Sequence, residues 1–110
     1  LISHAEDANL VSNGIATAVA EEIIVAREIA LARHTGAHVH IAHISTKEGI
    51  DHVRRAKEAG LNVTAEVTPH HLLIPELKEN AKNTNFKMAP PLRTDADVEM
   101  MRTALSSGLI

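Results

Sequence analysis

Apolar and polar positions along the chain follow two periods in alternation, which predicts helices separated by short strands. Between residues 16 and 33, apolar residues recur every three to four positions, the spacing that places them on one face of an amphipathic helix. Thr35 and Gly36 follow this segment and should end the helix. The apolar stripe that we expect to face the core consists of Val19, Ile23, Ile24, Ala26, Ala30 and Leu31.

Segments with strict alternation predict the strands. Residues 38–44 and 63–68 each alternate between two faces, as short and largely buried strands do. A further strand should end at His4, and residues 87–89 should form a very short strand that two prolines terminate. The polar stretch 75–86 is expected to be a loop that contains a helical turn.

Two more helices are predicted from capping signals. Ser45 and Glu48 have the spacing of a capping box, and Gly60 is a suitable residue just beyond the end of the helix that they open. Thr94 and Asp97 are expected to open the last helix. The residues of these two helices that we expect to face inward are Ile50, Val53, Ala56, Val98, Met101 and Leu105.

Strands and helices in this alternation indicate βα repeats, and therefore an α/β fold with a parallel sheet and right-handed crossovers. The chain has one Phe and neither Tyr nor Trp, so its core must be aliphatic, as is typical of a parallel sheet covered by helices. The 110 residues are expected to form one domain, residues 1–110. The pattern alone leaves open whether the sheet is open or part of a barrel.

Charge and composition narrow the partners and the kinds of site. The formal net charge is -3 and no run of Lys or Arg stands out, so we expect a small-molecule partner, and neither nucleic acid nor an anionic membrane surface. No apolar run approaches the ~20 residues of a membrane span. The absence of cysteine excludes disulfides and thiolate metal sites, so any metal must be held by His and carboxylate ligands. This composition is compatible with a cytoplasmic location.

Two histidines are candidate metal ligands. His4 and His43 each stand at the carboxyl end of a predicted strand, one strand-helix unit apart, so a parallel sheet would bring them to the same edge. Neutral imidazoles in that arrangement suit a divalent metal such as zinc. The alternative is a purely structural role, because two histidines without a third ligand are a weak signal. His38 and His40 stand at the start of the strand, on the face opposite to that of His43, and should point away from this edge.

Four short motifs, taken together, resemble the middle part of a dihydroorotase, a cyclic amidohydrolase of the amidohydrolase superfamily. They are His-Ala-Glu-Asp at 4–7, His-Ile-Ser-Thr-Lys at 43–47, Thr-Pro-His-His-Leu-Leu at 68–73 and Lys-Met-Ala-Pro-Pro-Leu-Arg at 87–93. The resemblance implies a β/α (TIM) barrel. Since such a barrel needs roughly 250 residues, the chain can hold about three of its eight strand-helix units and is expected to be an internal fragment.

The resemblance also implies a site and a reaction. His4 and His43 correspond to two ligands of a two-metal zinc centre, which is incomplete here because the other ligands lie on strands outside this chain. The group that transfers the proton lies there too, so we expect no catalytic residue in this fragment and no activity from it alone. The complete enzyme would hydrolyse dihydroorotate to N-carbamoyl-aspartate in pyrimidine biosynthesis, in the cytoplasm. His70 and His71 are expected to be structural residues around the site.

Ala89 departs from the family pattern and is the candidate substrate-binding position. Dihydroorotases usually carry Asn before the two prolines and hold the pyrimidine-like ring with it, whereas Ala has no side-chain hydrogen bond to offer. Either the backbone at Ala89 holds the ring or the substrate differs. Allantoinases resemble the chain in having Ala there, but they usually differ at the positions of His71 and Leu92. The alternatives are therefore an allantoinase or hydantoinase, or a non-catalytic dihydroorotase-like scaffold subunit.

A fragment of a barrel should self-associate. Its two outer strands would expose unpaired edges, and its inner sheet face, expected to be lined by Ile41, Val63 or their neighbours, would be uncovered. We therefore expect self-association of the isolated chain, and a homo-oligomer for the complete protein.

Overall fold

The computed structural model describes residues 1–14, 17–80 and 82–110. Ala16, at which the apolar pattern begins the first long helix, lies outside the described residues. In chain order the elements are β1 (Ile2–His4), α1 (Ala8–Ser12), α2 (Thr17–Thr35), β2 (Val39–Ala42), α3 (Lys47–Glu58), β3 (Val63–Ala65), α4 (Pro69–Leu73), η1 (Lys78–Asn80), η2 (Thr84–Phe86) and α5 (Asp95–Ser106).

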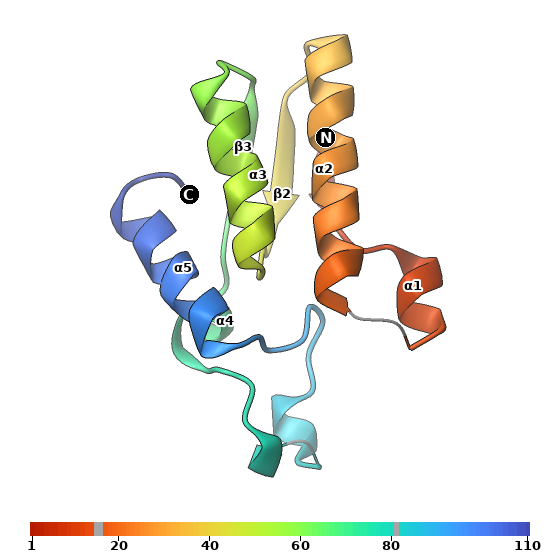
Figure 1. The fold of residues 1–110 in the computed structure, drawn as a ribbon, viewed down its shortest axis with the longest axis vertical. Helices are drawn as coiled ribbons and strands as arrows, with labels where there is room; N and C mark the ends of the chain where they lie inside the picture. The colour runs from red at the N-terminus through yellow and green to blue at the C-terminus, as the bar shows by residue number, and fades with distance from the viewer. Residues whose placement is uncertain (15–16, 81) are drawn as a thin grey trace.

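The described strands form one parallel sheet in the order β1-β2-β3, which confirms the α/β fold expected from the βα pattern. Ile2 lies opposite His40, and Val39 lies opposite Val63. Figure 1 shows α2 and α3 side by side over one face of the sheet, with α5 next to α3. The arrow of β2 points to the end of the molecule that carries α1, α4 and the 74–94 connection, so these segments lie at the carboxyl ends of the strands.

The core lies between the sheet and these helices. Val39, Ile41 and Val63 point into it and are at most 2% exposed. Of the expectation that Ile41, Val63 or their neighbours line the uncovered sheet face, the two named residues are therefore wrong and their neighbours are right. That face carries the alternate residues, among them His40 and Thr64, and is largely polar. The reason is that α2 and α3 pack on the side of the sheet where the aliphatic residues are.

The buried stripe of α2 differs from the expected one. Of the expected residues only Ile24 is buried, whereas Val19, Ile23 and Leu31 are each more than 40% exposed. The helix is apolar on more than one side, so periodicity could not select the side that faces the sheet. The residues that α2 buries are Ala20, Glu21, Ile24, Val25, Glu28, Ile29 and Ala32.

Capping explains where α3 and α5 begin. Thr94 and Asp97 form the expected capping box, which is confirmed by reciprocal hydrogen bonds. The expected box of Ser45 is wrong, because Thr46 is the N-cap of α3 and accepts a hydrogen bond from the Gly49 N–H at 3.1 Å. In α5 the expected inward residue Leu105 is 47% exposed, and the helix buries Ala104 instead, in addition to Val98 and Met101.

The connection between β3 and α5 was predicted least well. Residues 87–89 are not a strand, and the pair 70–71 lies on the short helix α4. Pro69 occupies the first turn of α4, where its missing N–H costs nothing. β3 ends earlier, at Ala65, and the chain then turns into α4.

β1 and β3 each pair on one side only within the described residues. Self-association stays a prediction, and its physical basis is now these two strand edges rather than an apolar inner face. No helix in the described part of the chain is long and apolar enough to cross a membrane.

Candidate functional site

The structure brings His4 and His43 together at the carboxyl ends of β1 and β2. The Nδ1 atom of His4 lies 2.9 Å from the Nε2 atom of His43. The two rings meet edge to face, with centroids 4.6 Å apart. The expectation that both side chains reach the same edge of one parallel sheet is confirmed. The metal-ligand role of the two residues stays a prediction.

The backbone of His43 explains how its side chain reaches His4. By strand alternation His43 should share the face of Val39 and Ile41, which pack against the helices. Instead its φ is 39°, in the left-handed region that a residue with a side chain adopts at a cost of about 1–3 kcal/mol. This conformation turns the ring out of the alternation at the point where β2 has ended at Ala42.

The donor set suits a divalent metal. Two nitrogen atoms that face each other across 2.9 Å could both turn to one ion. The other ring nitrogen of His4, Nε2, lies 3.3 Å from Oε2 of Glu6, so this carboxylate favours the tautomer that leaves Nδ1 free. Carboxylates that orient ligand histidines in this way are a regular part of zinc sites. Among the described residues, no group of three or more His, Cys, Asp or Glu could hold an ion.

His38 and His40 lie away from this pair. Both contact the Thr64 hydroxyl on β3, from His38 Nε2 at 2.9 Å and from His40 Nδ1 at 2.8 Å. Because His40 stands opposite Ile2, it occupies the same sheet face as His4, two residues further from the edge. The expected separation from the site, based on their position at the start of the strand, is confirmed. The other expected reason, an opposite face, does not apply, because His40 shares the sheet face of His4.

His71 supports the segment that carries the two prolines. Its Nε2 donates to the carbonyl oxygens of Pro90 at 3.1 Å and Pro91 at 3.3 Å, while its Nδ1 lies 2.9 Å from the hydroxyl of Thr68. His71 is 2% exposed, and this burial lowers its pKa below the ordinary value. The ring is therefore held neutral, with a proton on Nε2, as a brace between α4 and residues 90–91.

Acid should weaken this brace. In the unfolded chain His71 binds a proton below about pH 6.5, whereas in the folded protein it does so only at lower pH. The stability it contributes is complete above about pH 6.5 and is lost as the pH falls toward the lowered pKa. Urea midpoints at pH 7.5 and 5.5 should therefore differ less in His71→Gln than in the wild type. His70→Gln, at the exposed neighbouring position, should keep the full difference, and an equal loss of pH dependence in both variants would contradict the assignment.

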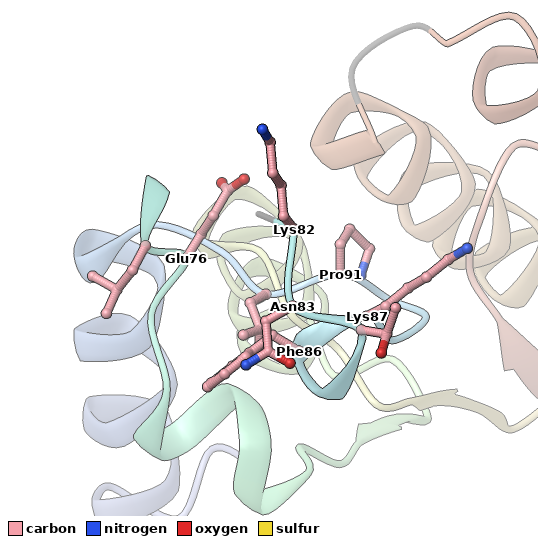
Figure 2. Close-up of a pocket in the computed structure, with 9 residues that line it drawn as sticks. Glu76, Lys82, Asn83, Phe86, Lys87 and Pro91 are labelled. Atoms are coloured by element: carbon pink, nitrogen blue, oxygen red, sulfur yellow. The ribbon is translucent and has the colours of Figure 1, made fainter. Parts of the chain in front are cut away.

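Ala89, the candidate substrate-binding residue, is exposed and precedes this braced segment. A pocket of about 270 Å³ lies nearby in the same connection, with Phe86 and Pro91 in its wall (Figure 2). In Figure 2 the ammonium groups of Lys82 and Lys87 extend away from Phe86. Ala89 is not among the residues that line this pocket, and its role in holding the ring stays a prediction.

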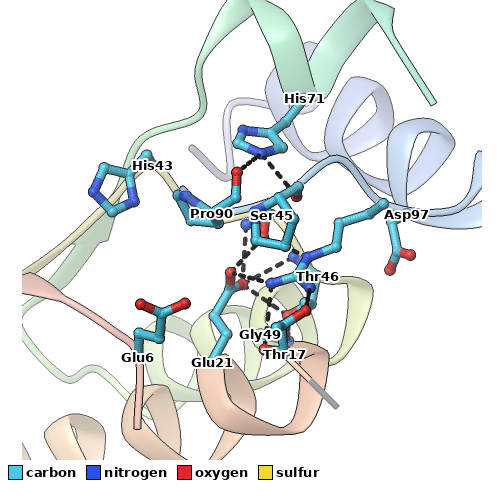
Figure 3. Close-up of polar contacts among 12 residues, drawn as sticks. Glu6, Thr17, Glu21, His43, Ser45, Thr46, Gly49, His71, Pro90 and Asp97 are labelled. Carbon is cyan, nitrogen blue, oxygen red and sulfur yellow. Dashed lines mark hydrogen bonds and ion pairs between the residues drawn. The ribbon is translucent and has the colours of Figure 1, made fainter. Parts of the chain in front are cut away.

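A buried carboxylate that the sequence analysis missed lies between these motifs. Glu21 on α2 is 2% exposed and accepts hydrogen bonds from Ser45 and Thr46, and the Arg93 guanidinium lies 3.5 Å from it (Figure 3). The signal that could have revealed it is its position three residues before Ile24, on the buried stripe of α2. A carboxylate on an inward face must have partners, because burying it alone is too costly.

Comparison with known proteins gives relatives in sequence. The chain is 50% identical to a dihydroorotase of Streptomyces coelicolor over 84% of the chain, a match that covers 22% of that relative. It is 44% identical to the dihydroorotase of Latilactobacillus sakei and 45% identical to that of Caldanaerobacter subterraneus, in both cases over the whole chain and 29% of the relative. No family model matches the sequence.

Solved structures show the same fold at lower identity. A D-hydantoinase (dihydropyrimidinase) from Thermus sp. matches 99% of the chain with a TM-score of 0.80 and 24% identity. The dihydropyrimidinase from Brevibacillus agri matches with a TM-score of 0.84 and 22% identity. Each match covers 28% of the solved chain and supports the arrangement of the sheet and its helices. From the sequence relatives, the chain belongs to the dihydroorotase family and spans less than a third of their length.

Proposed function

We propose that the chain is part of the β/α barrel of a zinc-dependent dihydroorotase. The observation that carries the proposal is the pair of imidazole nitrogens, His4 Nδ1 and His43 Nε2, that face each other across 2.9 Å at the carboxyl ends of neighbouring strands. Active sites of β/α barrels lie at this end of the strands. The high sequence identity to dihydroorotases supports the same reading.

In this proposal His4 and His43 hold zinc, and Glu6 keeps His4 in the required tautomer. When bound, zinc supplies polarisation of the substrate carbonyl and activation of water. His71 keeps the segment after Ala89 in place, so that the ring of the substrate meets a fixed backbone. The remaining ligands and the proton-transfer group belong to other parts of the enzyme, and the fragment alone is inactive.

The reaction is the reversible hydrolysis of a cyclic amide. The oxygen of water adds to the ring carbonyl carbon, the bond between this carbon and the ring nitrogen breaks, and the nitrogen takes up a proton. With dihydroorotate the product is N-carbamoyl-aspartate, a step of pyrimidine biosynthesis. The small-molecule substrate is thus the partner that we propose for the site.

The experiment that tests this proposal compares substrates. Purified native full-length protein, loaded with zinc, should convert dihydroorotate faster than allantoin, hydantoin or dihydrouracil when product is measured by chromatography. Faster conversion of one of the other rings would replace dihydroorotase by the corresponding cyclic amidohydrolase. Zinc binding without hydrolysis of any ring would favour the non-catalytic scaffold subunit.

A hydantoinase-type or allantoinase-type activity is the second candidate, and a specific observation favours it. Ala89 offers no side-chain hydrogen bond to a ring, and the solved structures that share the fold include hydantoinases and dihydropyrimidinases. The identities to those structures are low, whereas the identities to dihydroorotases reach 50%. The sequence relatives therefore favour dihydroorotase over the hydantoinase-type or allantoinase-type activity.

Ala89→Asn separates the two candidates further. If the ring is dihydroorotate, an added amide at this exposed position should gain one hydrogen bond and lower KM by roughly 2- to 10-fold, the worth of a typical neutral hydrogen bond. Steady-state kinetics on the full-length protein would measure it, with Ala96→Asn on the exposed face of α5 as the matched control. A KM that rises, or that falls equally in the control, would count against ring contact at Ala89.

A further inference from the structure

We propose that Glu21 is a positioning residue. It holds the loop that carries His43 and, through Arg93, the segment that carries Ala89. In this way it keeps the loop and the segment at a constant distance and orientation to each other. The inference deepens the proposed function, on which it rests, because it concerns the same site. Neither Glu21 nor Arg93 touches the imidazole pair, so their effect on the site would be exerted through the backbone.

Glu21 binds the loop after β2 through several donors. Its Oε1 atom accepts the backbone N–H groups of Ser45 and Thr46, both at 2.9 Å, and the Thr46 hydroxyl at 2.8 Å. Its Oε2 atom accepts the hydroxyl of Ser45. Figure 3 shows these contacts converging on one carboxylate from α2. Ser45 lies two residues after His43. Glu21 therefore attaches the end of the His43 loop to α2.

Arg93 ties the second segment to the same point. It is 7% exposed, its Nε donates to the Ser45 hydroxyl at 3.0 Å, and one of its Nη2 contacts is Oε2 of Glu21 at 3.5 Å. Its Nη1 donates to the Thr17 hydroxyl at 2.6 Å, at the start of α2. Arg93 comes directly after the Pro-Pro-Leu run. Residues 89–92 are therefore attached through Arg93 to α2, the helix that also holds the His43 loop.

Residues 90–93 are thus held from two sides. His71 donates to the carbonyl oxygens of Pro90 and Pro91. At the other end of the segment, Glu21 pairs with Arg93. The packing around the carboxylate is close, because a Cβ at Gly49 would lie 2.9 Å from the Thr46 hydroxyl oxygen and 3.2 Å from Glu21 Oε1. The arrangement therefore has little room to shift as a unit.

Energetics favour a positioning role over a stabilising one. A buried ion pair repays its desolvation only partly, and apolar residues of similar volume often stabilise a core equally well. Apolar residues, however, could not accept hydrogen bonds from two backbone N–H groups and two hydroxyls, as the Glu21 carboxylate does. The φ of 39° at His43 is a conformation that persists only where the surroundings hold it, and the Glu21 contacts begin two residues away.

The test compares neighbouring glutamates in the native full-length protein. Glu21→Gln keeps the shape but turns an amide NH₂ toward groups that are themselves donors, while Glu22→Gln alters a half-exposed residue on the next face of α2. Zinc affinity, measured by competition with a chelating dye, should fall about 10- to 100-fold in Glu21→Gln, as for other residues that orient ligands, and should be unchanged in Glu22→Gln. KM for dihydroorotate should rise in the same variant.

Two further variants separate positioning from general loss of stability. Val53→Ala empties part of the core without touching the network, so it should lower the melting temperature and leave zinc affinity and KM unchanged. Ser45→Ala removes the hydroxyl that joins Glu21 to Arg93 and is a milder change, should Glu21→Gln fail to fold. It should weaken zinc binding and raise KM in the same direction as Glu21→Gln.

Hydrogen-deuterium exchange tests the positioning role of Glu21 without a measurement of enzyme activity. Glu21→Gln, or Ser45→Ala in its place, should speed exchange in peptides spanning 43–49 and also in those spanning 87–97, whereas Val53→Ala should not select these two segments. Faster exchange in one segment only, or variants that behave like Val53→Ala in zinc affinity and KM, would overturn the positioning role. A wild type that hydrolyses no ring would refute the proposed function, and the exchange result would still decide the role of Glu21.

Discussion

Replacing His43 by alanine should abolish zinc binding at the edge formed by β1 and β2 and lower hydrolysis of dihydroorotate by about three orders of magnitude or more. Among the described residues, Nε2 of His43 and Nδ1 of His4 are the imidazole nitrogens that face each other at this edge. Without either of them the chemistry that zinc supplies to carbonyl and water is lost. Zinc content and kcat/KM of the full-length variant measure the two effects separately.

His40→Ala is the control for this prediction. His40 lies on the same strand, two residues further from the edge, and contacts Thr64 rather than the imidazole pair. Its loss should leave zinc content unchanged. Tight zinc binding that survives His43→Ala would contradict the assignment and would direct attention to His38 with His40, or to His70 with His71.

Replacing Arg93 by methionine should lower the free energy of unfolding by about 3–5 kcal/mol, because Glu21 would remain buried without its cationic partner. Methionine keeps most of the side-chain volume, so a cavity is not the cause. Urea denaturation of the full-length protein, analysed by midpoint and slope, gives the change.

Arg55→Met is the matched control. Arg55 pairs with Asp51 on the surface of α3 and its side chain is 59% exposed, so its removal should cost less than about 1 kcal/mol. If both variants lost the same small amount, the Glu21–Arg93 contact would be no stronger than a surface pair, and the carboxylate would have to be stabilised by Ser45 and Thr46 alone.

The elements with a clear period were predictable from the sequence. β2, α3 and α5 were expected close to where they form, because their alternation or capping signals are local. The placement of His4 and His43 at the same edge was also predictable, since neighbouring parallel strands have their carboxyl ends at one edge of the sheet. The resemblance of the motifs to dihydroorotases agrees with the identities of 44 to 50% found for the relatives.

Other features could not be read from local pattern. α2 is apolar on more than one side, so its inward face was set by what it packs against, and the buried Glu21 was hidden among aliphatic neighbours. Residues 87–89, expected to be a very short strand, form none, although β3 pairs on one side only. The polar character of the uncovered sheet face followed only from the side on which α2 and α3 lie.

By itself, the sequence determined the αβ alternation, the parallel sheet and the common edge that His4 and His43 reach, because each depends on period, capping and strand order. Only the tertiary structure decided how His43 turns to reach His4, through a left-handed backbone at the end of β2. It also decided that Glu21 and Arg93, which are 72 positions apart in the sequence, contact each other in the protein interior. A buried polar group takes its partners from whatever the fold brings near, and that is a property of packing that no local period records.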